Sequence, residues 1–151
     1  MSEPILIVDL APQKVAAIRR VVPQSGLGAF FDEILPKLHG LIAAAGATPA
    51  GAPLARYYNG DRGAFDTEAG VPFTGTIATS GEVQVMHLPA GKAAKVMHLG
   101  SYESLSHEYP RLEAWLTEHG MTPGVGPWEV YLSEPGTAEA DLRTEVFWPA
   151  G

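Results

Sequence analysis

Cysteine is absent from the 151 residues, which excludes disulfides, thiolate metal sites and cysteine nucleophiles. Charged residues are sparse at 18%, and positive charge is the scarcer sign, because 10 lysines and arginines accompany 17 aspartates and glutamates for a net charge of −7. Direct nucleic-acid binding is therefore not expected, since it requires a basic surface. No apolar run approaches the roughly 20 residues that span a bilayer, and no signal peptide is recognisable. We expect a cytoplasmic protein without a membrane partner.

Motifs for common cofactors and metals are also missing. The sequence contains no Gly-x-Ser-x-Gly, Walker or Gly-rich dinucleotide string. His87 and His98 lie on either side of a turn at 89–91 that predicts a local hairpin, in which the two rings would not face each other. No third ligand has suitable spacing, so we predict no metal and no cofactor.

The sequence does contain an internal repeat. A shift of 74 positions superimposes seven identical residues between Phe31 and Tyr57 on their counterparts, among them Gly46 on Gly120 and Tyr57 on Tyr131. We interpret residues 1–151 as one domain made of two copies of one module, at about 3–79 and 82–149, joined near Ser80.

Both copies show the same order of elements. Apolar residues recur with a helical period in the middle of each copy, and β-type runs flank them. Each copy is predicted to carry a strand, a helix and two further strands, at 15–18, 30–42, 54–58 and 71–78 in the first and at 93–97, 105–116, 128–132 and 142–148 in the second. Gly46 and Gly120 are predicted to end the two helices.

These elements predict an α+β fold in which duplicated strand-helix-strand-strand modules share an antiparallel sheet. Both helices would pack on one face, and a ligand cleft would lie near the pseudo-twofold axis. Strand alternation places Trp128, Val130 and Leu132 on one face and Glu129 and Tyr131 on the other. Because the first set is apolar, we expect it to lie under the helix, which leaves Glu129 in the cleft.

A carboxylate on a largely apolar strand needs a partner or a raised pKa, and a ligand cation is one candidate partner. The alternative is a structural ion pair with Arg56 or Arg143. Aromatic side chains near the cleft would add cation–π attraction, although aromatic residues on strands more often serve packing. The candidate ligand-binding residues are Tyr57, Tyr58, Phe73, Glu129, Tyr131, Glu145 and Trp148.

Three strings of the second copy resemble a known family: HLGSY at 98–102, WEVYLSEP at 128–135 and LRTEVFWP at 142–149. Together they resemble the GyrI-like small-molecule-binding family, which supplies effector-binding domains to AraC-type and MerR-type multidrug-sensing regulators. The resemblance implies a duplicated fold, a cleft for amphipathic aromatic or cationic ligands, and an acidic pocket residue at Glu129. No DNA-reading segment precedes the first module, so a role in transcription would require a separate DNA-binding regulator.

Three functions fit these residues. The favoured one is a stand-alone protein that binds an amphipathic small molecule for sensing or sequestration. The second is a hydrolase of strained electrophilic natural products with Glu129 as general acid or base, a role that the resemblance also implies. The third is interaction with a protein partner such as DNA gyrase, on which the family's founding member acts.

Overall fold

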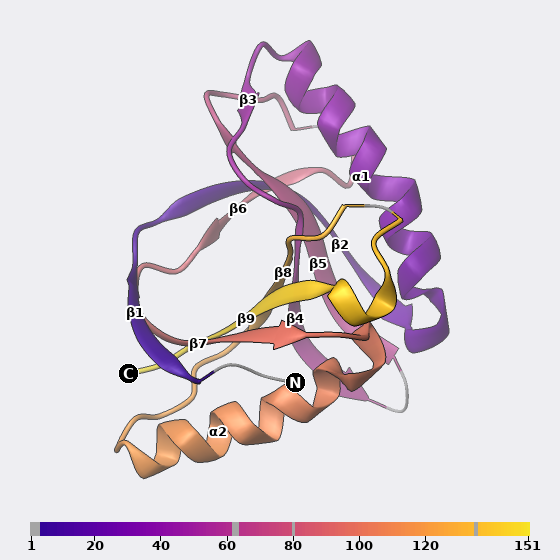
Figure 1. The fold of residues 1–151 in the computed structure, drawn as a ribbon. Helices are drawn as coiled ribbons and strands as arrows, with labels where there is room; N and C mark the ends of the chain where they lie inside the picture. The colour runs from indigo at the N-terminus through magenta and orange to yellow at the C-terminus, as the bar shows by residue number, and fades with distance from the viewer. Residues whose placement is uncertain (1–3, 62–63, 80, 135) are drawn as a thin grey trace. The chain divides into compact units, whose positions relative to one another are not determined.

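The computed structural model describes residues 4–61, 64–79, 81–134 and 136–151 (Figure 1). Ser80 at the predicted junction and Pro135 of the WEVYLSEP string lie outside the described residues. The chain forms two compact units, which are described separately. The first unit is Pro12–Pro89, and the second unit is Met1–Ala11 with Ala90–Gly151. Neither helix in the described part of the chain is long and apolar enough to cross a membrane.

The first unit is an antiparallel sheet in the order β4-β5-β2-β6 with one long helix. Its helix α1 packs against β2 and β5 and buries one residue per turn, namely Phe30, Ile34, Leu38 and Ile42. The elements are β2 (Gln13–Pro23), the 3₁₀ turn η1 (Gln24–Gly26), α1 (Leu27–Ala44), β3 (Thr48–Pro49), β4 (Leu54–Asp61), β5 (Ala64–Thr74) and β6 (Gln84–Leu88). The short β3 pairs with β5.

The second unit is an antiparallel sheet in the order β1-β7-β9-β8, and its helix packs against β7 (Figure 1). Its elements are β1 (Leu6–Leu10), β7 (Gly91–Leu99), the 3₁₀ helix η2 (Tyr102–His107), α2 (Glu108–Glu118), β8 (Trp128–Tyr131), η3 (Glu139–Asp141) and β9 (Arg143–Pro149). One apolar cluster fills the space between α2 and the sheet: Ile5, Ala94, Val96, Leu105, Leu112, Leu116 and Val146.

The α+β class and the order of elements are confirmed. Each unit contains a strand, a helix and two further antiparallel strands in that sequence, as predicted. Gly46 and Gly120 follow the two helices with φ of 72° and 71°, a left-handed conformation that favours glycine. Local sequence signals therefore fix the helix ends in both units.

Three predicted details are wrong. The third strand of the first copy, expected at 71–78, is β5 at Ala64–Thr74, because cross-strand pairing with β2 and β4 outweighs its glycines and polar residues. No hairpin joins β6 to β7: β6 pairs with β2, whereas β7 pairs with β1 and β9. Strand β1 was not expected, and its pairing with β7 places the N-terminal residues in the second unit rather than with the first copy.

Candidate functional site

Glu129 lies at the centre of β8 and is only 6% exposed. Its cross-strand partner on β9 is Val146, which in turn pairs with Val96 on β7. Both valines belong to the apolar cluster beneath α2. Because directly opposed residues of an antiparallel sheet share a face, Glu129 points towards the helix.

This orientation corrects the prediction that Trp128 lies under the helix and Glu129 on the opposite face. Trp128 is opposite Phe147 and stacks on that ring with a centroid separation of 5.4 Å, on the face away from α2. The first two residues of β8, Trp128 and Glu129, are therefore both buried although they lie on opposite faces of the strand. An apolar set of alternating residues does not identify the helix-bearing face when the other face is also buried.

Two tyrosine hydroxyls donate hydrogen bonds to Glu129. Tyr109, on the first turn of α2, lies 2.5 Å from Oε2, and Tyr131, two residues along β8, lies 2.8 Å from Oε1. Glu129 forms no salt bridge within the described residues of the second unit, so Arg143 does not neutralise it as that structural alternative required. The carboxyl group is therefore buried with neutral donors on both oxygens.

The electrostatics of Glu129 follow from this setting. Burial raises the pKa of its carboxyl group above the ordinary value, because the charged form loses hydration. The hydrogen bonds from Tyr109 and Tyr131 and the proximity of His98 act in the opposite direction and favour the carboxylate. Burial also raises the pKa of the Tyr102 hydroxyl, with a further contribution from the charge of Glu129.

Each of the two tyrosines that donate to Glu129 packs against another aromatic ring. The edge of Trp148 packs against Tyr109 at 5.9 Å between centroids, and its indole N–H donates to the carbonyl of Gly124. Tyr102 packs edge to face against Tyr131 at 5.9 Å and is 46% exposed. The second unit thus joins a buried carboxyl group to a cluster of four aromatic side chains that extends to the surface.

Of the other predicted residues in the second unit, Tyr131 and Trp148 lie in this cluster, and Glu145 does not. Glu145 alternates with Val146 and so projects from the face opposite to Glu129. Its carboxylate forms an ion pair with Lys95 Nζ at 2.6 Å. The prediction that Glu145 lines the same site as Glu129 is therefore wrong.

The predicted residues of the first unit each have local partners. Tyr57 packs edge to face against Phe65 at 5.9 Å. Tyr58 donates to Glu68 and has the Arg19 guanidinium 3.8 Å from its ring centroid; burial and this hydrogen bond raise its pKa to about 12. Phe73 is buried beneath Lys14. A ligand-binding role for these three residues stays a prediction.

Sequence reasoning missed Tyr109, Tyr102 and His98 as residues of the site. Tyr109 lies within the helix predicted at 105–116, and its ring packs on the core cluster. A signal was available, because a tyrosine on a buried helix face needs a partner for its hydroxyl group. His98 was considered only as a metal ligand, and within the described residues no group of three His, Asp or Glu side chains could hold a metal ion.

Comparison with known proteins identifies the family. A sequence model described as the GyrI-like small molecule binding domain matches residues 3–150. The chain belongs to this family. No curated protein matches the sequence.

Three relatives of known structure share the fold of this GyrI-like domain. The EcmrR chain in its DNA complex superimposes with a TM-score of 0.86 at 21% identity, over 99% of this chain and 57% of EcmrR, and the crystallised EcmrR C-terminal domain gives 0.77 at 19% over 98% and 97%. This chain thus spans little more than half the length of EcmrR.

The other two similar structures are described as a hydrolase and as a complex with a bound cation. A hydrolase from Listeria innocua gives a TM-score of 0.71 at 13% identity, over 97% of this chain and 91% of the other. SAV2435, solved with bound tetraphenylphosphonium, gives 0.62 at 14% over 99% and 94%. At these identities the likeness establishes the fold alone.

Proposed function

We propose that this GyrI-like domain binds an amphipathic aromatic cation at Glu129, with Tyr109, Tyr131, Tyr102 and Trp148 as the surrounding aromatic contacts. The observation that carries the proposal is the buried carboxyl group of Glu129, which forms no salt bridge within the described residues. A carboxylate in this setting gains most from a partner that brings positive charge and replaces water with apolar surface.

The neighbouring rings support the same class of ligand. Tyrosine and tryptophan faces attract cations by about 0.5–2 kcal/mol each when water is excluded. Both tyrosines that hold Glu129 are only partly buried, and Tyr102 beside them is partly exposed. The Tyr102 side is therefore the side from which we propose that a ligand approaches. SAV2435 was solved with tetraphenylphosphonium, which makes this cation a suitable first probe.

The test uses two probes of the same shape and opposite charge, tetraphenylphosphonium and tetraphenylborate. Binding is measured by calorimetry and thermal shift for the wild type, Glu129→Gln and Glu145→Gln. The two variants remove the same charge, but Glu145 lies on the other face of the sheet beside Lys95. Unit charges about 8 Å apart at an effective dielectric constant of about 20 attract by about 2 kcal/mol, or roughly thirtyfold in affinity.

We expect Glu129→Gln to lose about that factor for the cation and Glu145→Gln to lose little. Equal losses in both variants, or stronger binding of the borate anion than of the cation by the wild type, would overturn cation binding at Glu129.

A hydrolytic function is the second candidate, and one observation favours it. Glu129 combines a raised pKa with two phenolic hydroxyl groups on its oxygens, which is the equipment of a general acid or base. Mass spectrometry of electrophilic aromatic compounds incubated with the wild type and Glu129→Gln separates the two functions. Conversion by the wild type alone supports a hydrolase, whereas stabilisation by an intact compound supports a binding protein. No response to any compound would favour a protein partner, DNA gyrase being the one predicted.

A further inference from the structure

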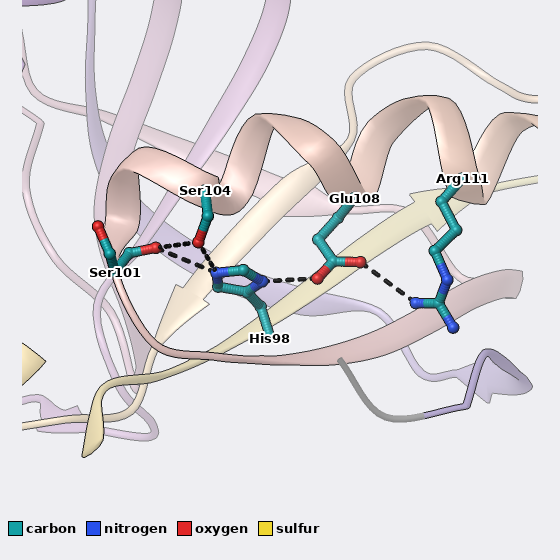
Figure 2. Close-up of polar contacts among 5 residues, drawn as sticks. All are labelled: His98, Ser101, Ser104, Glu108 and Arg111. Carbon is teal, nitrogen blue, oxygen red and sulfur yellow. Dashed lines mark hydrogen bonds and ion pairs between the residues drawn. The ribbon is translucent and has the colours of Figure 1, made fainter. Parts of the chain in front are cut away.

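A buried polar network next to the Glu129 site is built around His98, which is 3% exposed (Figure 2). His98 Nδ1 lies 2.6 Å from Glu108 Oε2, and Arg111 Nη1 lies 3.2 Å from the other oxygen of Glu108. On the opposite side of the ring, Nε2 lies 3.0 Å from the Ser101 carbonyl oxygen and 2.8 Å from Ser104 Oγ. The imidazole thus has three partners, Ser101 at the N-cap of η2, Ser104 in η2 and Glu108 in α2, and Arg111 contacts the same carboxylate.

The partners of the ring determine where its protons lie. A carbonyl oxygen can only accept, and the Ser104 hydroxyl donates its own proton to that same Ser101 carbonyl at 2.8 Å. Nε2 must therefore carry a proton to bond either group. On the other side, the Arg111 guanidinium bonded to Glu108 favours the carboxylate form of that side chain, and a carboxylate opposite Nδ1 requires a proton on that nitrogen as well. Both nitrogens donate, and the ring is an imidazolium.

This assignment excludes one chemical role that the residue types suggest. Ser104, His98 and Glu108 have the composition of a Ser-His-Glu triad and suitable distances. A serine nucleophile needs a neutral histidine whose Nε2 accepts the hydroxyl proton. Here the Ser101 carbonyl occupies Nε2 and receives the Ser104 proton, so the network is built to hold a charge and not to move one.

The imidazolium shares a sheet face with Glu129. His98 on β7 pairs with Thr144, which pairs with Tyr131, and the adjacent cross-strand row runs through Val146 to Glu129. Glu108 directly precedes Tyr109, whose hydroxyl bonds Glu129. The titratable and charged groups facing His98 are Glu108 with Arg111 from α2, and Tyr131 and Glu129 from β8; β9 contributes the Thr144 hydroxyl.

We propose that His98 is a charged positioning residue of the Glu129 site: Ser101, Ser104 and Glu108 hold it as an imidazolium, and its charge keeps Glu129 ionised. In this way His98, together with the hydrogen bonds from Tyr109 and Tyr131, favours a carboxylate over a neutral acid at the site and so favours cationic ligands. The inference extends the function proposed above, and its significance for ligands rests on that function. The lowering effect of His98 on the pKa of Glu129 supports it.

The charge on His98 can be tested in the wild-type protein without any ligand. ¹⁵N-edited spectra of the histidine side chains distinguish an imidazolium from either neutral tautomer. We expect the ring of His98, one of the five histidines and assigned through its backbone resonances in the wild type, to show two ring N–H groups at pH 7. A neutral tautomer for His98 at pH 7 would overturn the proposal, and this measurement does not depend on any variant folding.

The effect on Glu129 is tested by following its side-chain carboxyl ¹³C resonance with pH in the wild type and His98→Gln. An electrostatic role predicts a higher titration midpoint in the variant, since a positive charge has been removed. A merely structural role predicts the opposite shift, because a loosened site admits water and reduces the desolvation of Glu129.

Lys95→Gln is the matched control, since Lys95 is on the same strand but forms an ion pair with Glu145 on the other face. The titration midpoint of Glu129 in Lys95→Gln should equal its midpoint in the wild type. An unchanged or lower midpoint in His98→Gln refutes the proposal. If both NMR results hold and tetraphenylphosphonium does not bind, the charge assignment stands and the function proposed above fails.

Discussion

Tyr109→Phe tests directly whether Glu129 depends on its tyrosine donors. The substitution removes one hydroxyl group and leaves the ring that packs on Trp148 and on the core cluster. It deletes the 2.5 Å hydrogen bond to Oε2 of Glu129 and leaves Tyr131 as the remaining donor. Because the lost bond is to a buried carboxyl group, its contribution depends on the ionisation state of Glu129.

The expected magnitude follows from that dependence. A hydrogen bond to a charged group contributes about 1.5–3 kcal/mol, whereas one between neutral groups contributes about 0.5–1.5 kcal/mol. At a pH above the raised pKa, where Glu129 is ionised, Tyr109→Phe should therefore reduce the free energy of unfolding by about 2 kcal/mol. At a pH below the raised pKa, where the carboxyl group is protonated, the loss should fall to about 1 kcal/mol.

Urea unfolding at both pH values measures these losses, and Tyr102→Phe is the control. The Tyr102 hydroxyl donates no hydrogen bond to any described residue, and its ring is partly exposed, so its removal should change stability by less than about 0.5 kcal/mol. In the background of Glu129→Gln, the pH dependence of the Tyr109→Phe effect should disappear. A loss for Tyr109→Phe that equals the control, or that is the same at both pH values, would refute the reasoning.

Two further predictions concern stability. Burial raises the pKa of Glu129 above its ordinary 4.5, so the folded protein binds more protons than the unfolded chain above that pH, and stability falls as pH rises until the folded pKa is passed. Glu129→Gln should abolish this fall. Between pH 4.5 and the raised pKa of Glu129, the free energy of unfolding of the variant relative to the wild type, measured in urea titrations, should rise by about 1.4 kcal/mol per pH unit. Gly70→Ala should cost about 3 kcal/mol or more, because the added Cβ would lie 2.6 Å from Val15 Cγ1 and against the Ala16 backbone. Gly40→Ala, in α1 with open space around it, should instead stabilise the protein by about 0.5–1 kcal/mol, and a similar effect of both alanines in thermal unfolding would contradict this interpretation of Gly70.

Local patterns in the sequence predicted the order of the helix and the three main strands of each unit, whereas strand β1 was not expected. The helical period, the β-type runs and the two helix-ending glycines each report on neighbouring residues, and the structure confirms the order they predict. Strand partners were less accessible, because pairing depends on residues distant in sequence. Strand β1 pairs with β7 across more than 80 residues, and no local feature of Leu6–Leu10 specifies that partner.

The site was predicted only in part, for a related physical reason. Glu129 was found because a carboxyl group stands out on an apolar strand, and it is buried as expected. Alternation sorted its neighbours into two faces but could not identify which face meets the helix, since Trp128 and Phe147 bury the other one. The same limit applies to His98 and Tyr109, whose roles depend on contacts between elements rather than on their own sequence context.

Three polar residues of the candidate site lie where the two predicted copies of the repeat differ, whereas Tyr131 matches Tyr57. At the 74-residue shift, Glu108, Tyr109 and Glu129 correspond to Ile34, Leu35 and Ala55. Ile34 and Ala55 are fully buried, so the first unit fills the equivalent positions with apolar packing.

The identities that the copies share are mainly at helix ends and turns, such as Gly46 and Thr48 with Gly120 and Thr122. The polar residues of the site depend on one another, because each accepts or donates a hydrogen bond within the group. Glu129 without Tyr109 loses one of its two donors, and Glu108 without His98 is a buried carboxylate whose partner in the network is the partly exposed Arg111. A partial set would therefore be costly. The first unit instead carries apolar residues at the positions equivalent to Glu108, Tyr109 and Glu129, and its own buried carboxyl group, Glu68, is bonded by Tyr58 at a different place in the sheet.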